Sequence, residues 1–349
     1  MYTTHMNTPK IGFACKWLND PSECGGMKVN AKDRDLNGRS TTMRWLREHA
    51  DEAEQRQWDI MNHNAAAAVR LIERVGTLPP ERRMVRLGSE MLQGYTEPSW
   101  KAWWQRQEIQ DHLERIFAPI GETARRLDVR LSFHPGQFCV LASEADEIVE
   151  RSIEEFEYHA DMARFMGYGK AFQDFKINVH ISGKRGPAGI RSALRRLSPE
   201  ARNCITIEND EMSWGIDASL ELARDCALVL DLHHHWIRTG EYLQPTDDRV
   251  LGIIESWRGV RPALHYSISR EDVLVDHCAK TPPDHAVLLE TGHKKQKLRA
   301  HSDFYWNESV TDWALSFWDQ FDIQCESKGK NLASEQVYER AKTRMLATA

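Results

Sequence analysis

The chain has 349 residues, enough for one large domain or two ordinary ones, and 46 basic against 52 acidic side chains give it a formal net charge of −6. This balance excludes a nonspecific polycationic coat for DNA but still permits a local basic groove, because steering depends on the local field. No segment approaches the roughly 18 apolar residues of a membrane span, and the start, MYTTHMNTPK, lacks the apolar region of a secretory signal.

Short apolar segments alternate with helical patterns along the whole chain. Eight of them are apolar nearly throughout and are bounded by polar or turn residues, which is typical of strands buried on both faces. These predicted strands span residues 11–15, 83–88, 129–134, 176–181, 204–209, 227–232, 262–267 and 322–327.

Helical patterns fill the intervals between the predicted strands. The first is the longest and is rich in Ala, Glu and Arg, ending with NAAAAVRLIERVG at Gly76. The predicted helices span residues 40–75, 99–127, 144–167, 187–197, 217–225, 245–256, 270–279 and 308–319, and a last one runs from about 332 to 345.

Eight strands with helical crossovers and no Pro/Gly/Ser-rich linker predict an α/β protein in which residues 1–349 form a single (β/α)8 TIM barrel. A doubly wound open sheet is disfavoured because no GxGxxG follows the first strand. Two segments, 18–39 and 275–306, are longer than a barrel needs. Long loops in a compact domain are usually functional or disordered, so these two are candidate rims of an active site.

The seven cysteines include no CxxC pair, and four of them lie in or beside apolar runs, where a free thiol packs as a small apolar group. These four are Cys15, Cys204, Cys226 and Cys325. We therefore expect a reduced, cytoplasmic protein. The 15 histidines make metal or acid–base chemistry worth seeking.

The last six predicted strands all end in a histidine or an acidic residue. In a (β/α)8 barrel the carboxyl ends of the strands share one mouth, where the reacting residues lie. Burying six such groups together is costly unless metal ions compensate the charge. The tips are His134, His180, Glu208, Asp231 with His233, His234 and His235, His265, and Glu326.

The types of these side chains limit the metal. Imidazole with carboxylate and no cysteine suits Zn, Mn, Fe or Co, whereas an all-oxygen site would suit Mg or Ca. At least three histidines and three carboxylates exceed what one ion can use, so we predict two or three divalent ions bridged by a carboxylate. Such clusters polarise phosphoryl groups and generate hydroxide near neutral pH.

The histidines of DLHHHW cannot all be ligands. His234, three residues after Asp231, can turn back toward the mouth and is favoured. His233 points away if the strand continues, and His235 fits a supporting or surface position better.

The motifs SFHPGQF, VHISG, ITIENDE, LDLHHH, LHYS, HSDFYW and ESKGK, in this order, resemble those of UV-damage endonucleases. The resemblance runs from IGFACKW to ESKGK, about nine-tenths of the chain. That family has a (β/α)8 fold related to endonuclease IV, holds a trinuclear cluster commonly described with manganese, and nicks damaged double-stranded DNA immediately 5′ of UV photoproducts and some other lesions, including abasic sites.

The resemblance implies a set of site residues. Glu208 is the implied bridging carboxylate and, with Asp231 and Glu326, forms the implied catalytic group. His301, in RAHSDFYW, is a ligand that the strand tips alone do not indicate. The implied metal ligands are His134, His180, Glu208, Asp231, His234, His265, His301 and Glu326.

Two positions depart from the family pattern. Relatives often have a histidine before the proline of the loop after strand two, where this chain has Glu97, so we keep Glu97 as a candidate ligand. Ala263 stands where relatives often have a lysine described as modified and close to the metals. The chain therefore lacks one group near the metals, and either its metal occupancy or its pH and metal preference is expected to differ from the family's.

In the HPGQF segment, Pro135 and Gly136 turn the chain sharply after His134, so Gln137 and Phe138 are expected to project beyond the metals. An aromatic ring beside an amide suits filling the gap left by an extruded dinucleotide.

Other DNA contacts are less sharply indicated. Phe13, at the tip of strand one, either lines the lesion pocket or packs in the core. Lys328 and Lys330, with segment 292–299, are candidate phosphate contacts, although a solvated charge run explains KKQK nearly as well. The aromatic cluster of SWKAWW at 99–104 has helical spacing, which favours packing on the barrel.

The leading prediction is a metal-dependent endonuclease for UV-damaged DNA with no obligate protein partner. An abasic-site endonuclease with little photoproduct activity would use the same metals. A metal-dependent sugar isomerase or epimerase would need fewer metal ligands and would have no use for a DNA wedge such as Gln137 and Phe138. A noncatalytic DNA-binding barrel would have no use for charged strand tips.

Overall fold

The computed structural model describes residues 8–20 and 33–348. Its strands form a closed parallel barrel in which each strand pairs with the next and β8 returns to β1. Every strand lies within a predicted segment, so the expected (β/α)8 barrel is confirmed. The strands are β1 (Ile11–Ala14), β2 (Met84–Arg86), β3 (Arg130–Phe133), β4 (Lys176–His180), β5 (Ile205–Glu208), β6 (Ala227–Asp231), β7 (Ala263–Tyr266) and β8 (Asp322–Cys325).

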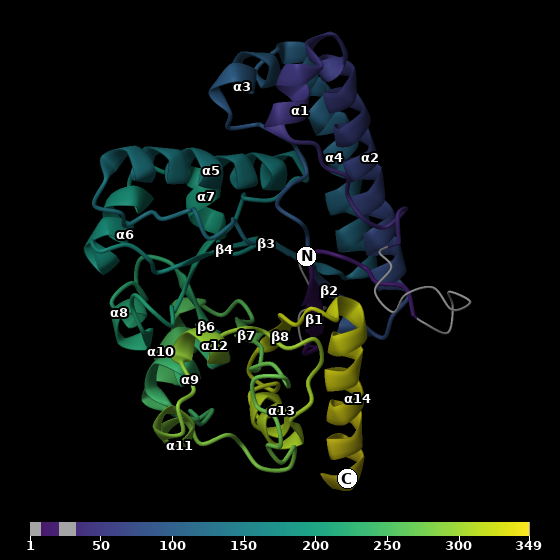
Figure 1. Cartoon of the computed structure of the whole chain (residues 1–349). Coiled ribbons are helices and arrows are strands. Elements are labelled where there is room, and N and C mark those ends of the chain that lie inside the picture. The colour runs from purple at the N-terminus through teal and green to yellow at the C-terminus, as the bar shows by residue number, and fades with distance from the viewer. Residues whose placement is uncertain (1–7, 21–32, 349) are drawn as a thin grey trace.

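Helices surround the ring of strands (Figure 1). Several begin at a side-chain cap that the sequence provides, such as Thr42 before α1 and Asn307 before α13. Their bounds are α1 (Met43–Glu48), α2 (Ala50–Gly76), α3 (Pro98–Trp104), α4 (Gln107–Leu127), α5 (Asp146–Phe165), α6 (Gly186–Leu194), α7 (Pro199–Cys204), α8 (Ile216–Leu220), α9 (Leu232–Thr239), α10 (Asp248–Ser256), α11 (His285–Glu290), α12 (Lys295–Leu298), α13 (Glu308–Leu315) and α14 (Lys330–Thr348), with a 3-10 turn, η1, at Pro80–Arg82.

The predicted helix at 270–279 is wrong. That segment forms successive turns, and Asp276 has a φ of 65°, which a right-handed helix cannot accommodate. Conversely, the predicted long loop 275–306 contains α11 and α12. The other loop, 18–39, lies largely outside the described residues, as does Cys24.

The sequence also missed the helix that begins directly after β6. The Asp231 carboxylate accepts a hydrogen bond from the His234 backbone N–H at 2.7 Å and thereby caps α9. The strand consequently stops at Asp231, and the next three histidines lie on a helical turn. Alternation between two faces of a strand therefore does not apply to them.

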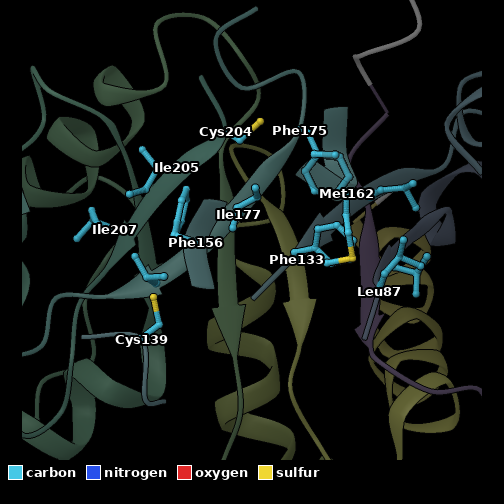
Figure 2. Close-up of a cluster of buried hydrophobic side chains, with 14 of the residues drawn as sticks. Leu87, Phe133, Cys139, Phe156, Met162, Phe175, Ile177, Cys204, Ile205 and Ile207 are labelled. Carbon is cyan, nitrogen blue, oxygen red and sulfur yellow. The ribbon is translucent and has the colours of Figure 1, made fainter. Parts of the chain in front are cut away.

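The main core lies between the barrel and its helices. Figure 2 shows part of it, with Phe133, Ile177 and Ile207 from the strands facing Phe156 and Met162 from α5, all buried. These strand residues point outward because successive side chains of a strand alternate between its two faces.

The inner face of β4 is polar along its whole length. Lys176, Asn178 and His180 share this face, opposite Ile177 and Val179, and Lys176 and Asn178 are buried. A polar interior differs from the branched apolar filling common in TIM barrels. It forms a polar floor beneath the mouth.

None of the described helices combines the length and the apolarity needed to cross a membrane. The assignment of residues 1–349 to a single domain stays a prediction.

Candidate metal centre

The ends of β3 to β8 bring the predicted side chains together around one carboxylate, that of Glu208. His265 Nδ1 lies 3.1 Å from Glu208 Oε2, His134 Nε2 lies 3.4 Å away and His180 Nε2 lies 3.9 Å away. His234 Nδ1 is 3.3 Å from the other oxygen, Oε1. Four imidazoles from four loops or strands thus surround one acidic group that is fully buried.

Glu326 and Asp231 lie beside this centre. Glu326 Oε1 is 3.2 Å from His265 Nδ1. Asp231 belongs with Glu208 and His265 to a group whose potential ligand atoms all lie within 4.8 Å of one another. Similar groups are formed by His134 with His180 and Glu208, and by His134 with His265 and Glu326.

Three buried atoms of the predicted ligands make no well-aligned hydrogen bond to a described residue, although His265 Nδ1 lies close to two carboxylates. The three atoms are Glu208 Oε1, Asp231 Oδ2 and His265 Nδ1. Buried polar atoms are normally satisfied, because an unpaired one costs about 1–3 kcal/mol and more when charged. Glu208, Asp231 and His265 thus have potential ligand atoms within 4.8 Å of one another, which is an arrangement that suits a divalent cation.

The histidines are oriented as metal ligands usually are. His134 Nδ1 lies 2.8 Å from the Pro135 carbonyl, His234 Nδ1 lies 3.0 Å from that of Asn209, and His301 Nδ1 lies 2.7 Å from that of Glu326. A carbonyl can only accept, so each Nδ1 carries the proton and each Nε2 keeps its lone pair. Ligating histidines characteristically donate their second ring N–H in this way.

Electrostatics show how the excess of carboxylates is balanced by protons. Burial alone would raise the pKa of the Glu208 carboxyl, but His265 and His180 hold it well below its usual value. Burial and the neighbouring charge of Glu208 raise the pKa of Asp231 well above its usual value. Burial opposes protonation of His234, yet Asp231, Glu208 and Glu211 together raise its pKa to about 10. The surroundings that favour a second proton on His234 would equally favour a cation, which would take the Nε2 lone pair in place of that proton.

His233 and His235 do not face Glu208. His233 contacts the hydroxyls of Ser267 and Ser269 at 2.9 and 3.2 Å, and His235 Nε2 lies 3.1 Å from Glu241. His234 alone of the three turns into the centre.

Four residues that lie at the centre were not predicted from the sequence. Arg86 forms an ion pair with Glu326, Asn178 donates a hydrogen bond to Glu208, and Lys176 Nζ lies 2.8 Å from His265 Nε2. Glu211 lies near His234. Alternation along β4, with Lys176, Asn178 and His180 at every second position, was the available signal for two of them.

Three predicted residues stand apart from the candidate metal groups of the described residues. His301 contacts the Glu326 carbonyl through Nδ1 but belongs to none of these groups. Glu97 precedes α3, with its backbone N–H bonded to the Gly94 carbonyl at 3.1 Å, and it belongs to none of the candidate metal groups in the described parts of the chain. Phe13 is 1% exposed and packs edge-on against Trp17. Its register partner Val85 is also buried in the main core, so the packing alternative holds for Phe13.

The HPGQF loop projects as expected. Gln137 is exposed, and Phe138 is 85% exposed although it follows His134 by only four residues. Gln137 lines a cavity of about 210 Å³ that also borders His180, Glu211 and Arg299.

The two lysines of ESKGK differ in exposure. Lys328 is exposed, 3.6 Å from Asp303, and Lys330 is half-buried at a φ of 50°. In SWKAWW, Trp103 and Trp104 are buried, so the packing interpretation of that motif holds.

Comparison with known proteins connects this geometry to a family. A family model described as UV-endonuclease UvdE matches residues 23–343. A UV-damage endonuclease of Neurospora crassa is 26% identical over 245 residues, which are 62% of this chain and 36% of the relative. A UV DNA damage endonuclease of Bacillus cereus strain G9842 is 23% identical over 298 residues, 81% and 82% of the two chains. The matched part of the chain thus spans about a third of the fungal relative.

Two solved structures share the fold. A crystal structure of SacUVDE superposes with a TM-score of 0.71 at 22% identity, covering 96% of this chain and 98% of that one. Endonuclease IV from Thermus thermophilus gives a TM-score of 0.52 at 13% identity, covering 81% and 95%.

Proposed function

Because the chain belongs to the UV-endonuclease UvdE family, we propose that it is a metal-dependent DNA repair endonuclease that hydrolyses the phosphodiester bond 5′ of UV photoproducts, and that it also cuts at abasic sites. The observation that carries this proposal is the buried Glu208 carboxylate, which has four histidines within 4 Å. We place the enzyme in the cytoplasm, acting on damaged duplex DNA without an obligate protein partner.

We assign two or three divalent ions to the centre, with manganese favoured and Zn, Fe or Co as the chemically suited alternatives. His134, His180 and Glu208 would hold one ion, and Glu208, Asp231 and His265 would hold another. Glu326, 3.2 Å from His265, would also serve the second ion. Bound divalent ions supply positive charge that stabilises the attacking and leaving oxygens of a phosphodiester during hydrolysis. Glu208, common to both groups, would be the carboxylate shared by two ions.

Polar side chains beside the centre hold the proposed metal ligands in place. Asn178 donates to Glu208 and Arg86 pairs with Glu326, which fixes both carboxylates before DNA arrives. Lys176 supports the far nitrogen of His265. Preorganisation of this kind avoids reorganisation during the reaction.

Lesion recognition is assigned to Gln137 and Phe138. Both are exposed and lie on the loop that carries His134, so the wedge stays within about 14 Å of a metal ligand, four residues at about 3.5 Å each. This short tether would place the cut close to the lesion. We assign the exposed Lys328 and the half-buried Lys330 to backbone phosphates.

The test is a nicking assay with metal analysis of the purified full chain. Duplexes carrying one cyclobutane dimer, one 6-4 product, one abasic site or no lesion are incubated with metal-loaded or chelator-treated protein. We expect metal-dependent nicks 5′ of each lesion and none in the undamaged duplex. Cleavage confined to the abasic duplex would assign the abasic-site alternative, and absence of cleavage on all four would refute the proposal.

A further inference from the structure

A second cavity lies at the barrel mouth, beside the ends of β1 and β2. It has a volume of about 400 Å³, and its lining includes Cys15 and Lys16 after β1, Ser89 after β2, and Arg39. We propose that this cavity binds the sugar–phosphate backbone of DNA, with Lys16 and Arg39 pairing with phosphate groups that flank the lesion. The inference rests on the proposed function and deepens it, because neither the strand tips nor the family resemblance indicates either cation.

Hydrogen bonds connect the wall of this cavity to the centre. Ser89 Oγ donates to the His134 carbonyl at 2.7 Å. The Cys15 backbone N–H donates to the Arg86 carbonyl at 2.7 Å, and the Arg86 side chain pairs with Glu326. The cavity therefore adjoins two of the proposed metal ligands, and a strand held in it would pass close to them.

The two cavities of the mouth lie on opposite sides of the barrel. The cavity that Gln137 lines is formed by residues after β3, β4 and β5. The second one is formed by residues after β1 and β2, and in the closed ring of eight strands β1 stands opposite β5. A duplex that reaches both cavities would therefore lie across the metal centre.

Two buried asparagines hold the segments that carry the cations. Asn37 accepts a hydrogen bond from the Trp17 N–H at 2.9 Å and donates to the Trp17 carbonyl at 2.8 Å, which fixes the residue next to Lys16. Asn64 holds Arg39 in the same way, at 2.7 and 3.0 Å. Because the backbone is already ordered at both positions, less conformational entropy is lost when DNA binds.

The cations at this cavity are not neutralised. The side chains of Lys16 and Arg39 are exposed, and neither makes an ion pair or a hydrogen bond with another described residue. Among the described lining residues, Glu90 is the one carboxylate. Burial lowers the pKa of the neighbouring Lys330, and the charges of Arg86 and Lys16 lower it further. A bound phosphate group would offset this excess of positive charge.

The rest of the lining suits a deoxyribose. Leu71, Leu87 and Met91 form an apolar side of the cavity, against which the sugar can pack while the phosphates face the cations. Contacts to sugar and phosphate position a protein on the duplex and carry no sequence information. We therefore expect this site to act equally on damaged and undamaged DNA.

The experiment measures how DNA affinity depends on salt. The full chain is compared with the neutral double variant Lys16→Gln/Arg39→Gln and with the charge-conserving Lys16→Arg/Arg39→Lys. Binding of an undamaged duplex, and of the same duplex with one cyclobutane dimer, is followed by fluorescence anisotropy at about 50 to 200 mM KCl, in excess chelator to prevent cleavage. The matched control, Arg126→Gln/Lys170→Gln, removes two exposed cations that precede β3 and β4, on the face opposite the mouth.

Each lost phosphate contact reduces the slope of log affinity against log salt by about 0.9, so the neutral double variant should lose about 1.8 on both duplexes. The charge-conserving variant and the control should keep the wild-type slope, and thermal unfolding should be unchanged in all of them. An unchanged slope in the neutral variant, an equal change in the control, or no binding by the wild type would overturn the proposal. A loss confined to the damaged duplex would also overturn it, because it would assign the two cations to the lesion.

The same proteins separate this site from the proposed function. If the slope falls as expected but the metal-loaded wild type nicks none of the duplexes, the backbone site stands and the proposed function fails.

Discussion

Replacing Gln137 and Phe138 together with alanine separates lesion recognition from catalysis. Phe138 is 85% exposed and Gln137 is also exposed, so neither contributes appreciable buried surface to the fold. Neither belongs to a candidate metal group in the described residues. The double variant is therefore expected to fold normally and to keep its metal content.

The expected loss is the energy that offsets unstacking of the lesion. Stacking of an aromatic ring on a base contributes roughly 1–3 kcal/mol. At about 1.4 kcal/mol per decade, this corresponds to roughly a five- to hundred-fold weaker recognition of damaged DNA. The loss should be largest where the lesion distorts the duplex least, because a distorted site is already partly unstacked. A cyclobutane dimer should therefore suffer more than a 6-4 product.

The assay is equilibrium binding and single-turnover cleavage on both lesions, with metal content measured in parallel. Leu251→Ala, which removes a half-exposed apolar side chain on α10, serves as control and should match wild type. Equal losses on both lesions accompanied by lost metal would show that the loop supports the cluster, and the wedge interpretation would be refuted.

Three further predictions follow from the site and the core. Glu208→Gln should lose more than one equivalent of metal and all nicking while the barrel persists by circular dichroism; retained metal and activity would exclude Glu208 as the bridge. Glu97→Ala should keep wild-type metal content, since the structure places Glu97 before α3 outside the candidate groups, and a fall measured by elemental analysis would restore it as a ligand. Burial of His159, whose Nε2 has no partner among the described residues, lowers its pKa to about 4. Between about pH 6.5 and pH 4 the unfolded chain therefore binds a proton at this residue that the folded chain does not bind, and acidification destabilises the fold. His159→Leu should therefore lose about 2 kcal/mol less unfolding free energy than wild type between pH 7 and pH 4.5 in urea titrations with chelator, and identical losses would contradict the assignment.

Much of the fold and the centre follows from local sequence patterns. Apolar strands alternating with helical segments predict a parallel barrel, and parallel strands direct their carboxyl ends to one face. His134, His180, Glu208, Asp231 and His265 could therefore be grouped without coordinates, because each stands at or next to the end of its own strand.

Tertiary structure decided the positions that depend on how elements meet. Arg86 belongs to the centre because barrel closure turns the inner face of β2 toward Glu326, which no local pattern encodes. Alternation along β4 indicates that Lys176 shares a face with His180, but only barrel closure brings it to His265. Asp231 caps α9 and so selects His234 from three adjacent histidines. Glu211 approaches His234 only because the ends of β5 and β6 lie side by side. The two strand ends are some twenty residues apart in the sequence, so their pairing is a tertiary contact that a local pattern does not specify.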